Sequence, residues 1–176
     1  GEFMQMEDVY RIDQGIERYM TKTQKKTADF MEGCMELGGL LGGWQEDEII
    51  ELKKYGHALG MAFQITDDIM DYRETAETTG KPVGNDLREG LLTYPLLSIV
   101  NDGNKDKLLE DIKGLNYGGN EQDIIDYVIA QGGIDNTLAV ADKYCKDALA
   151  ALAAVRDFPG KEFLVMAVEN LADRKV

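Results

Sequence analysis

The sequence predicts an all-α protein built as a helical bundle. Apolar residues recur with a period near 3.6 over long stretches, which is the pattern of helices that bury one face. The three prolines all lie at or after residue 82, so no proline interrupts helix formation before that point. Signals for strands are almost absent. At 176 residues, the chain is long enough for one domain with a sizeable core.

The N-terminal half is expected to form three helices, over about residues 7–20, 23–41 and 48–72. Asp47 is the expected N-cap of the third helix. Glycines at positions 38, 39, 42 and 43 end the second helix, because they let the backbone turn. The second helix carries one apolar stripe, the pattern of an amphipathic helix. Its members are Phe30, Cys34, Leu37, Leu40 and Leu41.

Residues 73–95, RETAETTGKPVGNDLREGLLTYP, are polar and rich in turn-forming residues, so they predict a long loop. Loops longer than about 12–15 residues are uncommon inside compact domains and are often functional. This loop is therefore a candidate site. Further helices with ordinary amphipathic patterns are expected near residues 95–100, 105–113, 121–130, 134–155 and 161–172.

The charge balance limits the classes of ligand. With 33 acidic and 19 basic residues, the net charge is −14. The negative electrostatic potential of such a protein disfavours the binding of nucleic acids and anionic lipids. An anionic ligand therefore needs local basic residues or bridging cations. Cys34 and Cys145 lie far apart with no neighbouring histidine, which gives little support to a zinc site or a disulfide framework. These features favour a cytoplasmic protein without a membrane span.

Residues 1–3, GEF, are interpreted as a cloning remnant and are left out of the fold argument. The native sequence is then expected to begin at Met4 or Met6. Residues 4–176 are expected to form a single all-helical domain.

Three aspartates interrupt the apolar run GMAFQITDDIMDY at residues 60–72. At about 100° per residue, Asp67, Asp68 and Asp71 fall near 0°, 100° and 40° around the axis, so their carboxylates share one sector. Like charges close together on a helix destabilise it, and burying carboxylates costs further free energy. A binding partner that offsets this cost is therefore expected. Carboxylate oxygens suit Mg²⁺, which completes its shell with water and phosphate oxygens. The competing interpretation is a solvated acidic face with no specific ligand.

Two neighbouring segments contain groups that suit a phosphate. KKTADF, at residues 25–30, places a cation and a hydroxyl donor early in the second helix, although alone it is better explained as a solvated basic turn. GKPVGNDL, at residues 80–87, has glycines that permit a close backbone approach, a cation at Lys81 and an acceptor at Asp86. Both segments strengthen the interpretation of the aspartates as a metal–phosphate site.

Four motifs follow in order between residues 25 and 97: KKTADF, YGHALGMAFQITDDIMDY, GKPVGNDLREG and TYPLL. Together they resemble the trans-isoprenyl diphosphate synthases, the polyprenyl synthetase family. The resemblance implies an isoprenoid synthase type of helical bundle around a cavity, usually in a homodimer. It also implies a prenyltransferase that uses Mg²⁺ to condense isopentenyl diphosphate with an allylic diphosphate.

The same resemblance assigns roles to individual residues. The three aspartates match the metal ligands of the family's second aspartate-rich motif. Lys26 and Lys81 are expected to contact the allylic diphosphate, and Thr27 to help position it. Gln64 matches a position near the reacting substrates.

Two departures bear on this assignment. Leu91 and Leu92 stand where many members carry a further lysine, and no DDxxD motif precedes Asp67. The chain therefore resembles the C-terminal half of the family and is expected to be inactive alone. Its expected partner is a second copy, as a homodimer, or the missing N-terminal half. The alternative is a non-catalytic helical subunit or regulator derived from this fold. A terpene cyclase relative is a third option, which GKPVGNDLREG disfavours.

Overall fold

A computed structural model describes residues 1–73 and 84–173. Its regular elements are helical, and the described residues contain no strand, so the predicted all-α class is confirmed. Lys81 lies outside the described residues. The described chain divides into two compact units, and the prediction of a single domain stays a prediction. None of the described helices combines the length and apolarity that a bilayer crossing requires.

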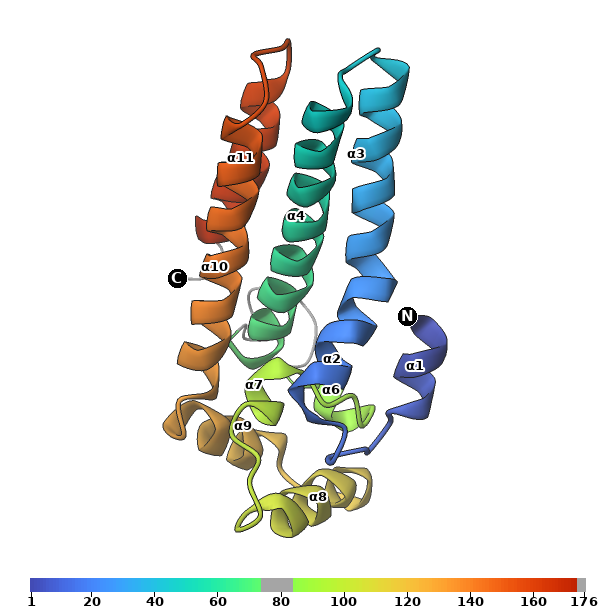
Figure 1. Cartoon of the computed structure of the whole chain (residues 1–176). Coiled ribbons are helices and arrows are strands. Elements are labelled where there is room, and N and C mark those ends of the chain that lie inside the picture. Colours follow the sequence, from blue (N-terminus) through green and yellow to red (C-terminus); the bar gives the residue numbers. More distant parts are fainter. Residues whose placement is uncertain (74–83, 174–176) are drawn as a thin grey trace. The chain divides into compact units, whose positions relative to one another are not determined.

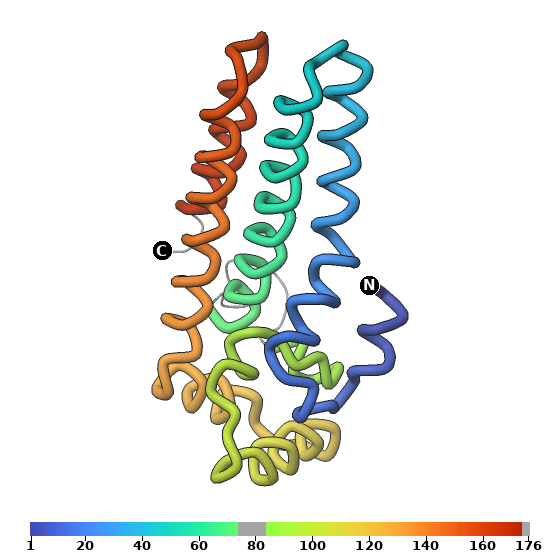
Figure 2. Tube along the Cα trace, in the orientation of Figure 1, coloured from blue at the N-terminus to red at the C-terminus, as the bar shows by residue number. Residues whose placement is uncertain are grey.

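The first unit comprises Gly1 and residues 23–66 and 139–173. It contains a π-helical turn, η1 (Gln24–Ala28), followed by α3 (Asp29–Leu41) and most of α4 (Glu46–Arg73). The unit also contains most of α10 (Gly133–Ala153) and all of α11 (Lys161–Asp173). Figures 1 and 2 show α3 and α4 running side by side.

The core of the first unit forms where α4, α10 and α11 meet. Tyr55 is fully buried there, and its hydroxyl donates a hydrogen bond of 2.9 Å to the carbonyl oxygen of Leu164. Burial raises the pKa of Tyr55 to about 12, so the hydroxyl remains a donor at neutral pH. The buried cluster consists of Leu52, Tyr55, Ala58, Ala62, Cys145, Ala148, Ala151, Leu152, Val155, Val168 and Leu171.

Glycines on α4 bring it close to the preceding helix. A Cβ atom at Gly56 would lie 2.6 Å from the carbonyl oxygen of Met31, and one at Gly60 would lie 2.6 Å from the Cα of Ala28. Larger residues would therefore push the two elements apart. This contact fixes η1 against the middle of α4.

The apolar stripe predicted on residues 30–41 is present on α3 but does not enter the core. All five of its members are exposed, whereas Gly39, on the opposite side of α3, packs against Ile49 and Leu52 of α4. Periodicity identifies an apolar face but does not identify what covers it.

The second unit comprises residues 2–22, 67–73 and 84–138. Its elements include α1 (Glu2–Glu7), α2 (Gly15–Thr23), the last two turns of α4 and the first residues of α10. Among the described residues between α4 and α10 lie the short helices α6 (Asn85–Arg88), α7 (Tyr94–Leu97), α8 (Lys105–Gly114) and α9 (Glu121–Ala130). A 3₁₀ turn, η2 (Leu115–Tyr117), follows α8.

The single helix expected over residues 7–20 is wrong, because the chain breaks between α1 and α2. Tyr10 and Gly15 adopt φ angles of 57° and 72°, which a continuous right-handed helix excludes. Asp8, in the break, is buried and pairs with Arg18 of α2 at 2.6 Å from Nε to Oδ1. This ion pair holds the start of the unit against α2.

Candidate metal site at the end of helix α4

Asp68 is the most buried of the three predicted metal ligands, with only 4% of its surface exposed. The hydroxyl of Tyr19, on α2, donates a hydrogen bond of 2.5 Å to its Oδ2 atom. The backbone N–H of Tyr94, at the start of α7, donates to the same oxygen at 3.4 Å. The rings of Tyr19 and Tyr94 pack edge to face, with centroids 5.6 Å apart. Two aromatic residues from distant segments thus enclose this carboxylate.

The surroundings of Asp68 raise its pKa from 3.8 to about 7. Burial is the main cause, and the nearby charges of Asp86 and Asp67 add to it. The hydrogen bonds from Tyr19 and the Tyr94 backbone act in the opposite direction but do not cancel the burial. A positive ion beside this carboxylate would lower its pKa again.

Asp71 holds the segment that follows residues 74–83. Its Oδ1 accepts a hydrogen bond of 3.0 Å from the backbone N–H of Asn85, and its Oδ2 accepts one of 3.1 Å from that of Asp86. The backbone N–H of Gly84, which has a φ of 71°, donates to the Asp71 carbonyl oxygen at 3.0 Å. Burial raises the pKa of Asp71, whereas the two backbone donors lower it. The sequence predicted that Asp86 acts as an acceptor. It did not predict that the backbone N–H groups of Asn85 and Asp86 would donate to the side chain of Asp71.

Asp67 is exposed, and its charge raises the pKa of both Asp68 and Asp71, so it lies near both. The three carboxylates do not form a closed cage. Among the described residues, the one trio of acidic or histidine side chains with ligand atoms within 4.8 Å of one another is Asp29, Glu32 and His57. An open arrangement still suits Mg²⁺, which typically keeps several waters and uses one or two carboxylates.

Thr27 and Gln64 are brought together in the first unit. The Thr27 hydroxyl donates a hydrogen bond of 3.1 Å to Oε1 of Gln64, so the contact between η1 and α4 fixes both side chains. Lys26 precedes Thr27 in the π-helical turn and is partly exposed. Such turns often occur at functional sites. Along α4, Gln64 comes four residues before Asp68.

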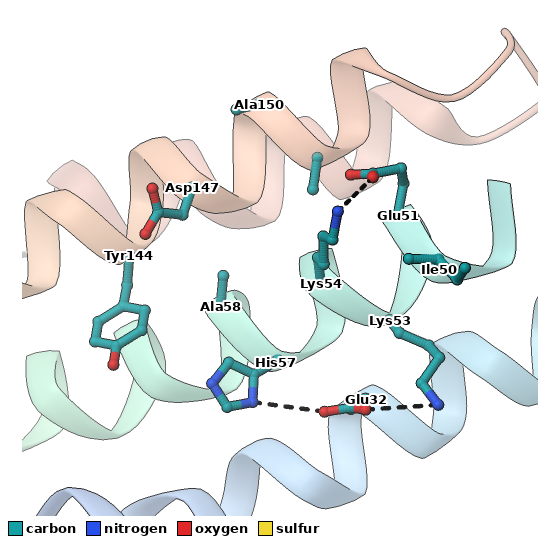
Figure 3. A pocket seen from close by; sticks show the side chains of 11 residues that line it. Glu32, Ile50, Glu51, Lys53, Lys54, His57, Ala58, Tyr144, Asp147 and Ala150 are labelled. Atoms are coloured by element: carbon teal, nitrogen blue, oxygen red, sulfur yellow. Dashed lines mark hydrogen bonds and ion pairs between the residues drawn. The ribbon is translucent and has the colours of Figure 1, made fainter. Parts of the chain in front are cut away.

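The first unit also has a pocket of about 670 Å³ between α3, α4 and α10, and its lining includes none of the predicted site residues that the structure describes. Figure 3 shows His57 and Lys53 of α4 both pointing toward Glu32 of α3. His57 Nδ1 lies 3.5 Å from Glu32 Oε2, and Lys53 Nζ lies 3.7 Å from Glu32 Oε1. Lys53 and His57 thus both lie close to the carboxylate of Glu32 in this pocket.

The sequence profile described as polyprenyl synthetase matches residues 1–131. The chain belongs to the polyprenyl synthetase family. It is 34% identical over 169 residues to the octaprenyl diphosphate synthase of Escherichia coli, covering 94% of this chain and 52% of that enzyme. It is also 34% identical over 149 residues to heptaprenyl diphosphate synthase component 2 of Geobacillus stearothermophilus, covering 85% and 47% of the two chains.

Solved structures of this family match the fold closely. A heptaprenyl diphosphate synthase of Staphylococcus aureus gives a TM-score of 0.85 at 28% identity, covering 99% of this chain and 55% of that one. A polyprenyl synthase of Caulobacter crescentus, complexed with calcium and isoprenyl diphosphate, gives 0.86 at 29% identity with the same coverage. The isoprenoid synthase type of fold is thus confirmed. The chain spans about half the length of the relatives that it matches.

Asp71→Ala is expected to destabilise the chain by about 1–2 kcal/mol, because two backbone donors at the start of α6 lose their acceptor. Urea unfolding followed by circular dichroism measures the change. Asp67→Ala is the matched control, and its exposed position predicts a change within about 0.5 kcal/mol. Equal effects of the two substitutions would contradict the anchoring role of Asp71.

Asp68→Asn is expected to stabilise the metal-free chain at alkaline pH. Because the folded-state pKa is raised to about 7, the wild-type carboxyl loses its stabilising contribution as the pH rises from about 4 through 7. The amide has no charge to bury, so the melting temperature of the variant should exceed that of the wild type by about 5–10 °C near pH 8.5. The difference in melting temperature should be smaller near pH 5. Thermal unfolding in EDTA measures this. A difference in melting temperature that does not change with pH would contradict the raised pKa of Asp68.

Proposed function

We propose that this chain is the part of a trans-prenyltransferase that carries the second aspartate-rich site, where Mg²⁺ holds the diphosphate of an allylic substrate. The observation that carries the proposal is the position of Asp68, a carboxylate buried at the end of α4 with Asp67 and Asp71 beside it on the same helix. A bound cation would offset the cost of burying a charged carboxylate near other acids. The calcium and isoprenyl diphosphate in the related Caulobacter crescentus structure support the same ligand chemistry.

The three aspartates would hold Mg²⁺ through carboxylate lone pairs that the protein hydrogen-bond donors leave available. Tyr19 orients Asp68 through its hydroxyl, and Asp71 keeps the start of α6 beside the end of α4. The bound Mg²⁺ supplies positive charge that stabilises a departing diphosphate. Asp67, as the most exposed of the three, is open to an ion that retains its water ligands.

The remaining predicted residues would act on the substrate. Lys26 and Lys81 are proposed to contact the allylic diphosphate, where a lysine acts as a point charge on phosphate oxygens. Thr27 would help position it, and its bond to Gln64 fixes the amide of that side chain, which is proposed to lie near the reacting carbons. Apolar surroundings would keep water from the carbocation that forms when diphosphate leaves.

Condensation with isopentenyl diphosphate is proposed to require more than this chain. The octaprenyl and heptaprenyl diphosphate synthases that this chain matches are about twice as long as the part that it covers. The further groups would come from residues outside the present sequence, such as an N-terminal half, or from another copy in a homodimer. The names of two relatives, each component 2 of a heptaprenyl diphosphate synthase, favour a second candidate function as one component of a multi-part enzyme.

Isothermal titration calorimetry with inorganic pyrophosphate tests the proposed site. The wild-type chain should bind it in the presence of Mg²⁺ and not in EDTA, because the acidic site repels the anion without a bridging cation. Asp67→Asn should weaken binding by about tenfold or more, since one metal ligand loses its charge. Asp102→Asn changes an exposed acid in the same unit and should have no effect. Binding that is equal in EDTA, or equal in Asp67→Asn, would refute the proposed site.

A further inference from the structure

Three side chains of α3 and α4 bring possible metal ligands to one place in the first unit. Asp29 and Glu32 lie three residues apart on α3, and His57 lies on α4. Each side chain offers one ligand atom, and these three atoms all lie within 4.8 Å of one another. We call these residues the α3–α4 trio. It shares no residue with the proposed magnesium site.

The distance between the imidazole and the nearer carboxylate suits two ligands of one ion. His57 Nδ1 lies 3.5 Å from Glu32 Oε2, and Figure 3 shows the ring pointing toward this carboxylate. A charge-assisted hydrogen bond between such groups spans about 2.7–2.9 Å. Two ligands of a tetrahedral Zn²⁺, each about 2.0–2.2 Å from the ion, lie about 3.3–3.6 Å apart. The observed separation therefore fits a shared ion better than a direct hydrogen bond.

Other contacts hold the two carboxylates of the trio in place. The side-chain amide of Gln24 donates a hydrogen bond of 3.1 Å to Oδ1 of Asp29. Lys53 Nζ lies 3.7 Å from Oε1 of Glu32, whereas His57 faces Oε2. Because each carboxylate oxygen has two lone pairs, these contacts orient the acids and still leave acceptor sites for an ion.

The charges around the trio favour a divalent cation. Lys53 pairs with Glu36 at 2.9 Å as well as with Glu32. The carboxylates of Asp29, Glu32 and Glu36 and the single ammonium of Lys53 together leave an excess of two negative charges when the imidazole is neutral. A divalent ion would neutralise this excess.

The pocket beside the trio provides access and further ligands. Glu32 and His57 both line the pocket of about 670 Å³ between α3, α4 and α10. Three protein ligands leave the fourth position of a tetrahedral ion open to water or to a small ligand from this pocket.

The donor set determines the class of metal. Imidazole suits Zn²⁺, Ni²⁺ and Cu²⁺, whereas carboxylate and water oxygens suit Mg²⁺ and Mn²⁺. The two classes of ion should therefore divide between the trio, which contains an imidazole, and the three aspartates at the end of α4, which have oxygen ligands alone.

We propose that the α3–α4 trio binds a divalent transition-metal ion, such as Zn²⁺, and that this ion links α3 to α4. The proposal does not depend on the proposed prenyltransferase site, because it uses other residues and another class of metal. Since the ion would bind the folded arrangement of the three ligands, it should raise the melting temperature of the chain.

His57 is the single histidine of the sequence, so its ring signals in NMR spectra report on this site alone. In the wild-type chain, spectra that correlate ring protons with ring nitrogens are expected to show a shift of the Nδ1 signal as Zn²⁺ is added. The shift should end near about one equivalent and should persist in excess Mg²⁺. Ring signals that do not respond to Zn²⁺, or that respond equally to Mg²⁺ alone, would overturn the proposal.

Isothermal titration calorimetry with Zn²⁺ measures the contribution of the imidazole. A Cys34→Ala background removes an exposed thiol that could also bind zinc. In this background, His57→Ala should weaken binding by about tenfold or more, because the nitrogen ligand is lost. Glu51→Gln is the matched control, since it changes an acid that lines the same pocket outside the trio and should leave the affinity unchanged. Asp67→Asn should also leave it unchanged.

Two results of the calorimetry would refute the proposal. One is an equal affinity for Zn²⁺ with and without His57→Ala. The other is a loss of affinity in Asp67→Asn that matches the loss in His57→Ala, which would assign the zinc to the aspartates. The ring signals of the wild-type chain decide the question even if His57→Ala fails to fold.

Discussion

The hydrogen bond between Tyr19 and the buried carboxylate of Asp68 is the interaction on which the second unit depends most. It joins α2 to the end of α4, and the Tyr94 backbone joins α7 to the same oxygen. A buried carboxylate is costly unless it is paired, and here its partners are a hydroxyl and an amide, neither of which carries charge. The arrangement is therefore less stable than an apolar core would be. We interpret this lower stability as a consequence of the proposed role of Asp68 as a metal ligand.

Helix α4 supports both sets of proposed functional residues. In the first unit, Gly60 lets η1 approach α4 closely, and this contact places Thr27 against Gln64. In the second unit, the last turns of α4 present the aspartates, and Asp71 anchors the start of α6. Two kinds of constraint act here: close backbone packing in one unit and hydrogen-bonded carboxylates in the other. Both constraints are made by protein groups alone.

The sequence predicted those parts of the fold that local patterns determine. The helices expected at 105–113, 121–130 and 161–172 agree closely with α8, α9 and α11, because each has an amphipathic period and clear ends. The break between α1 and α2 was missed, since it depends on a left-handed Tyr10 and the buried ion pair of Asp8. The exposure of the apolar side chains on α3, from Phe30 to Leu41, could not be predicted either, because apolar periodicity does not show which other elements pack against that face of the helix. The spacing of the aspartates made them candidate metal ligands, an assignment that stays a prediction, whereas the hydrogen bonds of Asp71 depend on a tertiary contact with residues 85 and 86.

Paramagnetic broadening by Mn²⁺ in amide NMR spectra tests the central claim most directly, because Mn²⁺ binds the same oxygen ligands as Mg²⁺ and reports its own position. In the presence of pyrophosphate, the account predicts broadening first at the amides of residues 66–72 and of Tyr19, which lies against Asp68. Broadening that instead begins around Asp29, Glu32 and His57, the other group able to hold an ion among the described residues, would contradict it. So would spectra that show no localised effect.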